Sequence, residues 1–286
     1  MPIDGVRRRA LALLLASPTG TIGLAIVLFF LVLALLAPLF APYDAIAVSS
    51  ENVLKGPSAR FMFGTDGNGM DVFSRVVYGA RYAFGIAVPV LLLGMALGVP
   101  IGLYAGYRGG WFDEITLRVM DALRVFPSII LALAIVAATG HSLFNVVVVI
   151  AVLDVPLFAR VVRAEVLALR RSGLAEAALA AGNPTWRILA VHLLPNCLRG
   201  AMAQVPIRMA WAVRVTATLA FIGVGIQAPT PEWGAMIRQG SEYMISGEWW
   251  VAIFPGTALV ILIIGFSMLG DGLEELLDPR SNNSSR

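Results

Sequence analysis

The sequence predicts an all-α protein that crosses a membrane several times, because it is strongly apolar and its charges are bunched. Of its 286 residues, 58% are hydrophobic and 14% are charged, and the mean hydropathy is +0.82, whereas a soluble domain carries about 25% charged residues. No charge occurs in residues 10–43, 82–107, 125–153 or 249–270. Each of these windows exceeds the roughly 20 apolar residues of a membrane-spanning helix. The same composition excludes a disordered chain, a disulfide scaffold and a nucleic-acid-binding domain.

Six membrane-spanning helices are expected, and the sequence defines some of them better than others. The first apolar stretch, 21–41, is longer than the apolar core of a secretory signal, which has about 7–15 residues, so we interpret it as a retained span that ends at Pro42. Glycine and proline interrupt the second span, as membrane helices tolerate. The third begins with charged turns that need water or protein around them. The other five expected spans cover residues 82–105, 113–138, 143–162, 200–226 and 250–269.

The basic residues predict that both chain ends face the cytoplasm, because lysine and arginine concentrate in cytoplasmic loops. With this orientation the two large outer loops hold Lys55, Arg60, Arg75 and Arg238, and Arg81 lies at the edge of a span. The cytoplasmic segments hold twelve arginines, namely Arg7, Arg8, Arg9, Arg108, Arg160, Arg163, Arg170, Arg171, Arg187, Arg199, Arg280 and Arg286. The opposite orientation would reverse this excess and is therefore disfavoured.

The chain then divides into five expected parts. These are a cytoplasmic N-terminus (1–18), a first transmembrane helix (19–41), an external loop (42–81), a core of five transmembrane helices (82–272) and a cytoplasmic tail (273–286). The core includes a long cytoplasmic loop, 163–199, in which the lone cysteine, Cys197, is interpreted as an inert apolar filler.

The long cytoplasmic loop is written as two helices with a break between them. Residues 164–181 are rich in alanine, leucine, arginine and glutamate, which favour helices. Gly182 suits a left-handed helix end, Asn183 suits an N-cap, and Pro184 suits the first turn of a second helix over 185–194, which stops near Pro195. We interpret this helix–break–helix as a docking element, because it carries no catalytic constellation.

Several motifs along the chain resemble one family of transporters. Glu176-Ala177-Ala178 with Gly182, followed by residues 192–196, is similar to the EAA signature of ABC importer permeases. Other stretches resemble the dipeptide, oligopeptide and nickel permeases within that group, in the same order and over about residues 61–280: 64–66, 71–75, 79–81, 109–114, 126–128, 229–234, 269–272 and 277–280. Met70 departs from the pattern, since the family usually has a basic residue before Asp71.

The resemblance implies a type I ABC importer permease fold in the bacterial inner membrane and a set of partners. Members pair with a second permease subunit, two cytoplasmic ATPases and an external solute-binding protein, and import small peptides or similar solutes by alternating access. A short helix of the EAA loop sits in a cleft of the ATPase, which implies ATPase coupling for Glu176, Ala177, Ala178 and Gly182. ATP and Mg²⁺ then belong to the ATPases. This chain is expected to bind no cofactor or metal, since its only lysine, Lys55, lies in no phosphate-binding loop.

A stand-alone secondary transporter, coupled to ions or protons, is the alternative function. Such coupling usually requires acidic residues or histidine inside the spans, and only Asp154 is placed well inside one. An intramembrane enzyme is disfavoured because no nucleophile and base are spaced to act together. The outer loop 228–249 carries Trp233 and Trp249, interpreted as interfacial anchors or as parts of an outer gate.

Two arginines inside the fifth expected span suggest a transport path. At 100° per residue, one polar stripe within an arc of about 80° contains Gln204, Arg208, Trp211 and Thr218, whereas Arg214 points about 120° away from Arg208. We hypothesise that Arg208 lines the path and favours solutes with a carboxylate or another anionic group. The alternative is that both arginines pair with carboxylates or helix-end carbonyls of the partner subunit.

A cluster of charges opens the third expected span. Glu114 and Arg118 are four residues apart, and Arg118 and Asp121 are three apart, so that they can pair along one helix face. We expect this cluster to be structural rather than part of a substrate site.

Overall fold

The computed structural model describes residues 17–140, 142–171 and 173–277, so the expectations for the N-terminal arginines and for residues 278–286 of the tail lie outside it. Five described helices are long and apolar enough to cross a membrane, and the pair α5 (Gly110–Val125) and α6 (Ser128–Thr139) makes a sixth if it is counted as one span. The five are α2 (Pro18–Leu35), α4 (Val72–Arg108), α7 (Leu143–Arg171), α11 (Val205–Ile222) and α13 (Trp250–Leu277). The predicted all-α membrane fold is confirmed.

The first span ends earlier, and the second span begins earlier, than the sequence predicted. Helix α2 ends at Leu35, and a short helix, α3 (Ala37–Phe40), follows with Pro38 in its first turn, because proline has no N–H to continue the first helix. Helix α4 begins ten residues before the expected Tyr82, since the Asp71 carboxylate accepts a 2.8 Å hydrogen bond from the backbone N–H of Ser74 and caps the helix. The external loop therefore ends at residue 71.

Helices α4 and α7 are packed closely through a row of glycines. Gly94, Gly98, Gly102 and Gly106 recur every fourth residue along α4 and face α7. A Cβ atom on Gly102 would lie 2.2 Å from the carbonyl oxygen of Ala159, closer than atoms can approach. Small residues at this period let two membrane helices approach at backbone distance, so this row fixes α7 against α4.

The third expected span is a pair of helices with a sharp bend between them rather than one continuous helix. Helices α5 and α6 meet at 85°, because Pro127 forces the preceding residue, Phe126, into an extended conformation (φ −82°, ψ 138°). The charges on α5 also pair differently: Asp113 binds Arg163 at 2.6 Å, and Asp121 binds Arg160, both arginines being on α7.

The pairing predicted within α5 is therefore not the one observed. No ion pair in the described part of the chain includes Glu114 or Arg118. The charges instead join α5 to α7, so the cluster is structural in a different way from the one expected.

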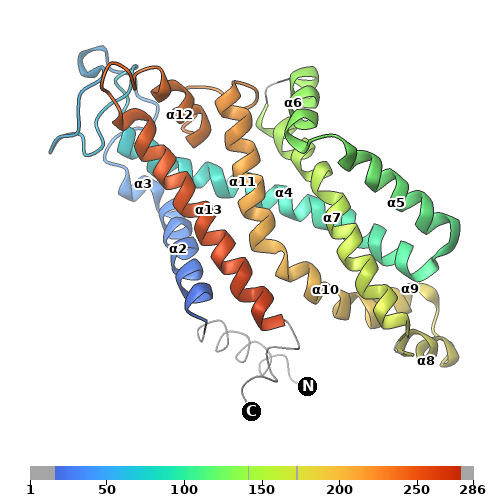
Figure 1. The fold of residues 1–286 in the computed structure, drawn as a ribbon. Coiled ribbons are helices and arrows are strands. Elements are labelled where there is room, and N and C mark those ends of the chain that lie inside the picture. Colours follow the sequence, from blue (N-terminus) through green and yellow to red (C-terminus); the bar gives the residue numbers. More distant parts are fainter. Residues whose placement is uncertain (1–16, 141, 172, 278–286) are drawn as a thin grey trace.

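The helices give the molecule two ends, which we name after the predicted orientation (Figure 1). The outer end holds the loop 41–71 and α12 (Trp233–Ser241), whereas the inner end holds the start of α2, the end of α13 and the segment α8–α10. The Ser17 hydroxyl donates a hydrogen bond of 3.2 Å to the Glu275 carboxylate, which joins the start of α2 to the end of α13. Both ends of the described chain thus lie on the side of the long loop, as the predicted topology requires.

Candidate coupling surface and transport path

The predicted first helix of the inner loop is split. Helix α7 continues to Arg171, and a second helix, α8 (Leu174–Ala180), starts after Gly173, whose φ of +75° is left-handed. Of the residues that resemble the EAA signature, Glu176 and Ala177 are exposed and Ala178 is buried. Helix α8 therefore presents one face outward while the other packs on the protein.

Gly182 ends α8 as predicted, with a left-handed φ of +79° and open space where a Cβ would lie. Asn183 acts differently from expectation, because its backbone N–H and its side-chain amide both donate to the carbonyl of Ala178, at 3.2 and 3.0 Å. Asn183 thus closes α8 instead of capping the next helix. Pro184 precedes the first turn of α9 (Thr185–Arg187) rather than lying inside it.

The second helix does not stop near Pro195. The chain passes from α9 through the π-helical turn η2 (Ile188–Leu193) into α10 (Leu194–Ala203), with Pro195 in the first turn of α10. Cys197 is fully buried there, and burial, followed by the nearby Glu165 carboxylate, raises the pKa of its thiol to about 11. Burial and the raised pKa both oppose formation of a reactive thiolate, which supports the predicted role of Cys197 as an apolar filler.

We call α8, residues 181–184 and α9 the coupling elbow. Its exposed residues include Glu176 and two large apolar side chains, Leu179 on α8 and Trp186 on α9, which are 60% and 67% exposed. Large apolar side chains gathered on an exposed surface mark contact sites for other proteins. The elbow therefore has the chemistry of a docking surface.

Inside the membrane-spanning part, the predicted polar stripe is anchored by an ion pair. Arg208 of α11 pairs with Asp154 of α7, whose carboxylate is 0% exposed. The guanidinium also lies 4.2 Å from the centre of the Trp211 ring, a cation–π contact. Pairing with a carboxylate of the second permease subunit is the alternative expected for Arg208 and Arg214. For Arg208, however, the carboxylate is Asp154 of this chain.

Gln204 and Thr218, the remaining members of the stripe, have no side-chain contact with this ion pair among the described interactions, although the Gln204 carbonyl accepts a 2.9 Å hydrogen bond from the backbone N–H of Arg208. Gln204 separates α10 from α11, so the fifth expected span is two helices, and Pro206 stands in the first turn of the second. Arg214 is exposed, and its carbonyl accepts a 2.8 Å hydrogen bond from the Thr218 hydroxyl.

A cavity of about 280 Å³ borders Arg208. It lies between the bend that joins α5 to α6, the middle of α7 and the start of α11, and its polar lining includes Arg208, Arg124 and Ser128. No ion pair within residues 17–140, 142–171 and 173–277 engages Arg124. The cavity wall therefore carries one neutralised arginine and one uncompensated arginine.

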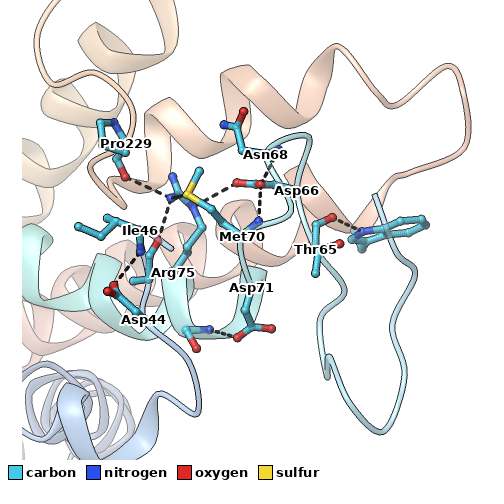
Figure 2. Close-up of polar contacts among 12 residues, drawn as sticks. Asp44, Ile46, Thr65, Asp66, Asn68, Met70, Asp71, Arg75 and Pro229 are labelled. Atoms are coloured by element: carbon cyan, nitrogen blue, oxygen red, sulfur yellow. Dashed lines mark hydrogen bonds and ion pairs between the residues drawn. The ribbon is translucent and has the colours of Figure 1, made fainter. Parts of the chain in front are cut away.

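The outer end is tied together by Arg75, which is 1% exposed (Figure 2). Its Nη1 donates to the carbonyl oxygens of Ala45 and Pro229, at 3.0 and 3.1 Å, and its Nε lies 3.5 Å from the Asp66 carboxylate. The same Nη1 lies 2.9 Å from the sulfur of Met70. One arginine thus joins the loop 41–71, helix α4 and the segment before α12.

Asp66 is fixed in turn by its own loop. Its Oδ1 accepts backbone hydrogen bonds from Asn68 and Met70, at 2.9 and 3.0 Å. Burial raises the pKa of this carboxyl, and the charge of Arg75 and the two backbone bonds partly offset that effect. Met70, which departs from the family pattern, is buried against Arg75, so an apolar side chain occupies the place expected for a basic one.

Glu232 and Trp233 start α12 in a buried position. The Glu232 carboxylate caps the helix by accepting the N–H of Ala235 at 2.8 Å, and burial raises its pKa to about 7 despite that bond and one from Gly234. The Trp233 indole donates to the carbonyl of Val76 at 3.0 Å and is 2% exposed. Trp233 is therefore a packing residue and not an interfacial anchor, whereas Trp249 is exposed.

Comparison with known proteins decides the family. The profile described as the binding-protein-dependent transport system inner membrane component matches residues 98–283, which is more than half of the chain. The chain belongs to that family. A second profile, the N-terminal transmembrane domain of oligopeptide transport permease C, matches residues 6–57 of this permease. The family resemblance that the motifs indicated is confirmed.

Named relatives of this permease span nearly its whole length. It is 40% identical to the dipeptide transport system permease protein DppC of Alkalihalophilus pseudofirmus, over 96% of this chain and 90% of the relative. It is 38% identical to the glutathione transport system permease protein GsiD of Pectobacterium atrosepticum, over 89% and 84%. It is 35% identical to the probable D,D-dipeptide transport system permease protein DdpC of Escherichia coli, over 94% and 90%.

A solved structure of the MetNI methionine ABC transporter, in an inward-facing conformation, has a similar fold. The TM-score is 0.55 at 23% identity, over 71% of this permease and 96% of the matched chain. At this identity the match speaks for the fold alone.

Proposed function

We propose that this permease is one of two membrane subunits of an importer for small peptides. Relatives named for dipeptide, D,D-dipeptide and glutathione transport support the substrate class. A cytoplasmic ATPase pair that binds ATP and Mg²⁺ would supply the energy, and an external binding protein would deliver the peptide. The observation that carries the proposal is the coupling elbow, a docking surface at the inner end whose sequence resembles the EAA signature.

The elbow is built to pass a movement into the spans. Helix α8 follows α7 directly, and η2 leads through α10 towards α11. Ile188 and Leu193 of η2 are fully buried against the core. When an ATPase cleft closes on Glu176 and Ala177, the displacement would therefore reach α7 and α11, the two helices joined by the pair Asp154–Arg208.

The path would run beside the cavity that borders Arg208. Gln204, Arg208, Trp211 and Thr218 form its stripe in this proposal, with Arg214 on a neighbouring face. Because Asp154 offsets the charge of Arg208, the arginine available to a peptide carboxylate in this cavity is Arg124. Alternating access would open this cavity towards the cytoplasm after ATP hydrolysis.

Transport in proteoliposomes tests the proposal against the secondary-transporter alternative. The permease would be reconstituted with its partner permease and ATPases, and the binding protein and a labelled dipeptide would be added to the side that carries the outer end. Uptake should require ATP on the other side and should vanish when the ATPase is inactivated by substitution of its phosphate-binding lysine. Dipeptide uptake by the permease subunits alone, driven by a pH or sodium gradient, would contradict it.

A further inference from the structure

A cavity at the outer end is lined by polar side chains that have no hydrogen-bond partner in the described part of the protein. It measures about 450 Å³ and lies between the C-terminal end of α11, residues 223–228 and α12. Small or apolar residues form part of the wall, namely Ala220, Ile226, Ala228 and Ala235. Four polar side chains complete it, namely Gln227, Arg238, Gln239 and Glu242. Cavities of about 300–1,000 Å³ with a few converging polar groups are typical of small-molecule sites.

The four polar side chains of this cavity have no hydrogen-bond partner in the described part of the protein. Across the described residues, no side-chain hydrogen bond and no ion pair engages Gln227, Arg238, Gln239 or Glu242. The neighbouring polar side chains behave differently, since Glu232 and Trp233 on the same helix segment bond to the backbone. Gln227, Arg238 and Glu242 are exposed and Gln239 is partly buried, so water meets these polar groups at present and a ligand in the cavity could replace it.

Gly223 makes room for the arginine. It ends α11 with a left-handed φ of +93°, and a Cβ at this position would lie 2.2 Å from Nη1 of Arg238. The guanidinium therefore lies against the C-terminal end of α11, where the helix dipole favours a cation, although no helix carbonyl accepts its hydrogen bonds in the described structure. The Arg238 guanidinium therefore lies at the cavity wall with its hydrogen-bond donors available.

We propose that this cavity is an outer subsite for the peptide, which rests on the function proposed above. Arg238 binds the C-terminal carboxylate through two parallel hydrogen bonds, the geometry that guanidinium groups favour. Glu242 binds the N-terminal ammonium group, and Gln227 and Gln239 bond to the peptide amide.

The spacing of the two charged residues suits a short peptide. Arg238 and Glu242 are four residues apart in helical conformation, which separates their backbone positions by about 6 Å. The charged ends of an extended dipeptide are separated by a similar distance, since each residue spans about 3.5 Å. The backbone spacing of the two charged residues is therefore compatible with a dipeptide that has both ends free.

Binding of labelled alanyl-phenylalanine to the purified permease–ATPase complex, without binding protein, tests the subsite. The parent should bind the free dipeptide at least about tenfold more tightly than its C-terminal amide. Arg238→Gln should weaken binding of the free dipeptide about tenfold and leave binding of the amide unchanged. Arg60→Gln removes an exposed arginine elsewhere at the outer end and is the matched control, which should behave as the parent.

Glu242→Gln provides a second test with the N-acetylated dipeptide, and it should remove the preference of the parent for a free amino end. Equal binding of dipeptide and amide by the parent, no measurable binding at millimolar peptide, or no effect of both substitutions would overturn the subsite. Loss of binding-protein capture by Arg238→Gln, with peptide binding unchanged, would make the cavity a protein-docking site and would also overturn it. ATP-dependent uptake by the parent separates these results from a failure of the proposed function.

Discussion

The outer and inner ends of this permease differ in how their polar and apolar side chains are placed. At the outer end, Arg75, Glu232 and Trp233 are buried. Arg75 and Trp233 donate to backbone carbonyls of distant segments, and Glu232 accepts from the backbone N–H of Ala235 at the start of its own helix. At the inner end, the coupling elbow exposes Leu179 and Trp186 and is closed by local bonds from Asn183. A network of buried polar bonds thus ties segments of the outer end together, whereas the elbow at the inner end is closed by local bonds and exposes two large apolar side chains.

The cost of burying charge explains this difference. A buried charge destabilises a protein unless an opposite charge or hydrogen bonds compensate it, so the outer end holds its shape only while each bond is made. The elbow buries no charged side chain among its described residues, and its shape depends on a left-handed glycine instead. Loss of a buried polar contact should therefore lower the free energy of unfolding more than a change in the elbow.

Arg75→Gln should have the largest effect. It removes two hydrogen bonds to backbone carbonyls and leaves the Asp66 carboxylate without its counter-charge. Breaking a buried ion pair from one side costs about 3–5 kcal/mol. Thermal unfolding in detergent should show a large loss of stability, and Arg60→Gln, at an exposed arginine, should show almost none. Similar stability of the two variants would refute the outer network as a structural tie.

The pair Asp154–Arg208 should give a similar but rescuable loss. Arg208→Gln leaves the carboxylate of Asp154 buried and unpaired, which also costs a few kcal/mol. The double variant Asp154→Asn with Arg208→Gln removes both charges and should recover most of the loss in the same unfolding assay. If the double variant is as unstable as the sum of the two single variants, the two side chains do not interact.

Glu232 should make stability depend on pH. Its pKa in the folded protein is about 7, against an ordinary value of 4.5, so folding favours the protonated form. The contribution is present in full below pH 4.5 and is lost as the pH rises to about 7, by about 3 kcal/mol. Glu232→Gln should therefore gain stability relative to the parent between pH 5 and pH 8. A difference between parent and variant that stays constant over this range would contradict the raised pKa.

Much of the fold was predictable because it depends on local composition. Charge-free windows located α2, α13 and most of α4, and Gly182 has the left-handed conformation that a helix-ending glycine suggested. Two other features were visible in the sequence but were not used: Asp71 stands three residues before Ser74, as an N-cap does, and Phe126-Pro127 interrupts the third span.

The period-four glycines of α4 were another available signal, since they predict a close helix contact without naming the partner helix. The pair Asp154–Arg208 had no local signal, because its members are 54 residues apart and meet only when α7 packs against α11. The surroundings of Arg75 depend in the same way on three segments meeting. Contacts of this kind follow from tertiary packing, which residue spacing along one helix does not encode.

Substrate-stimulated ATPase activity of the reconstituted complex with Gly182→Val tests the central claim most directly. Valine opposes the left-handed conformation, so the elbow should bend differently at a cost of about 1–2 kcal/mol. Two control variants isolate the effect. Gly247→Val also places valine at a positive φ (+105°) where a Cβ would meet no other atom, but at an outer position. Gly182→Asn keeps a residue that tolerates the left-handed conformation. We predict that Gly182→Val abolishes peptide stimulation while both controls retain it, with membrane insertion unchanged. Full stimulation in Gly182→Val would contradict the account.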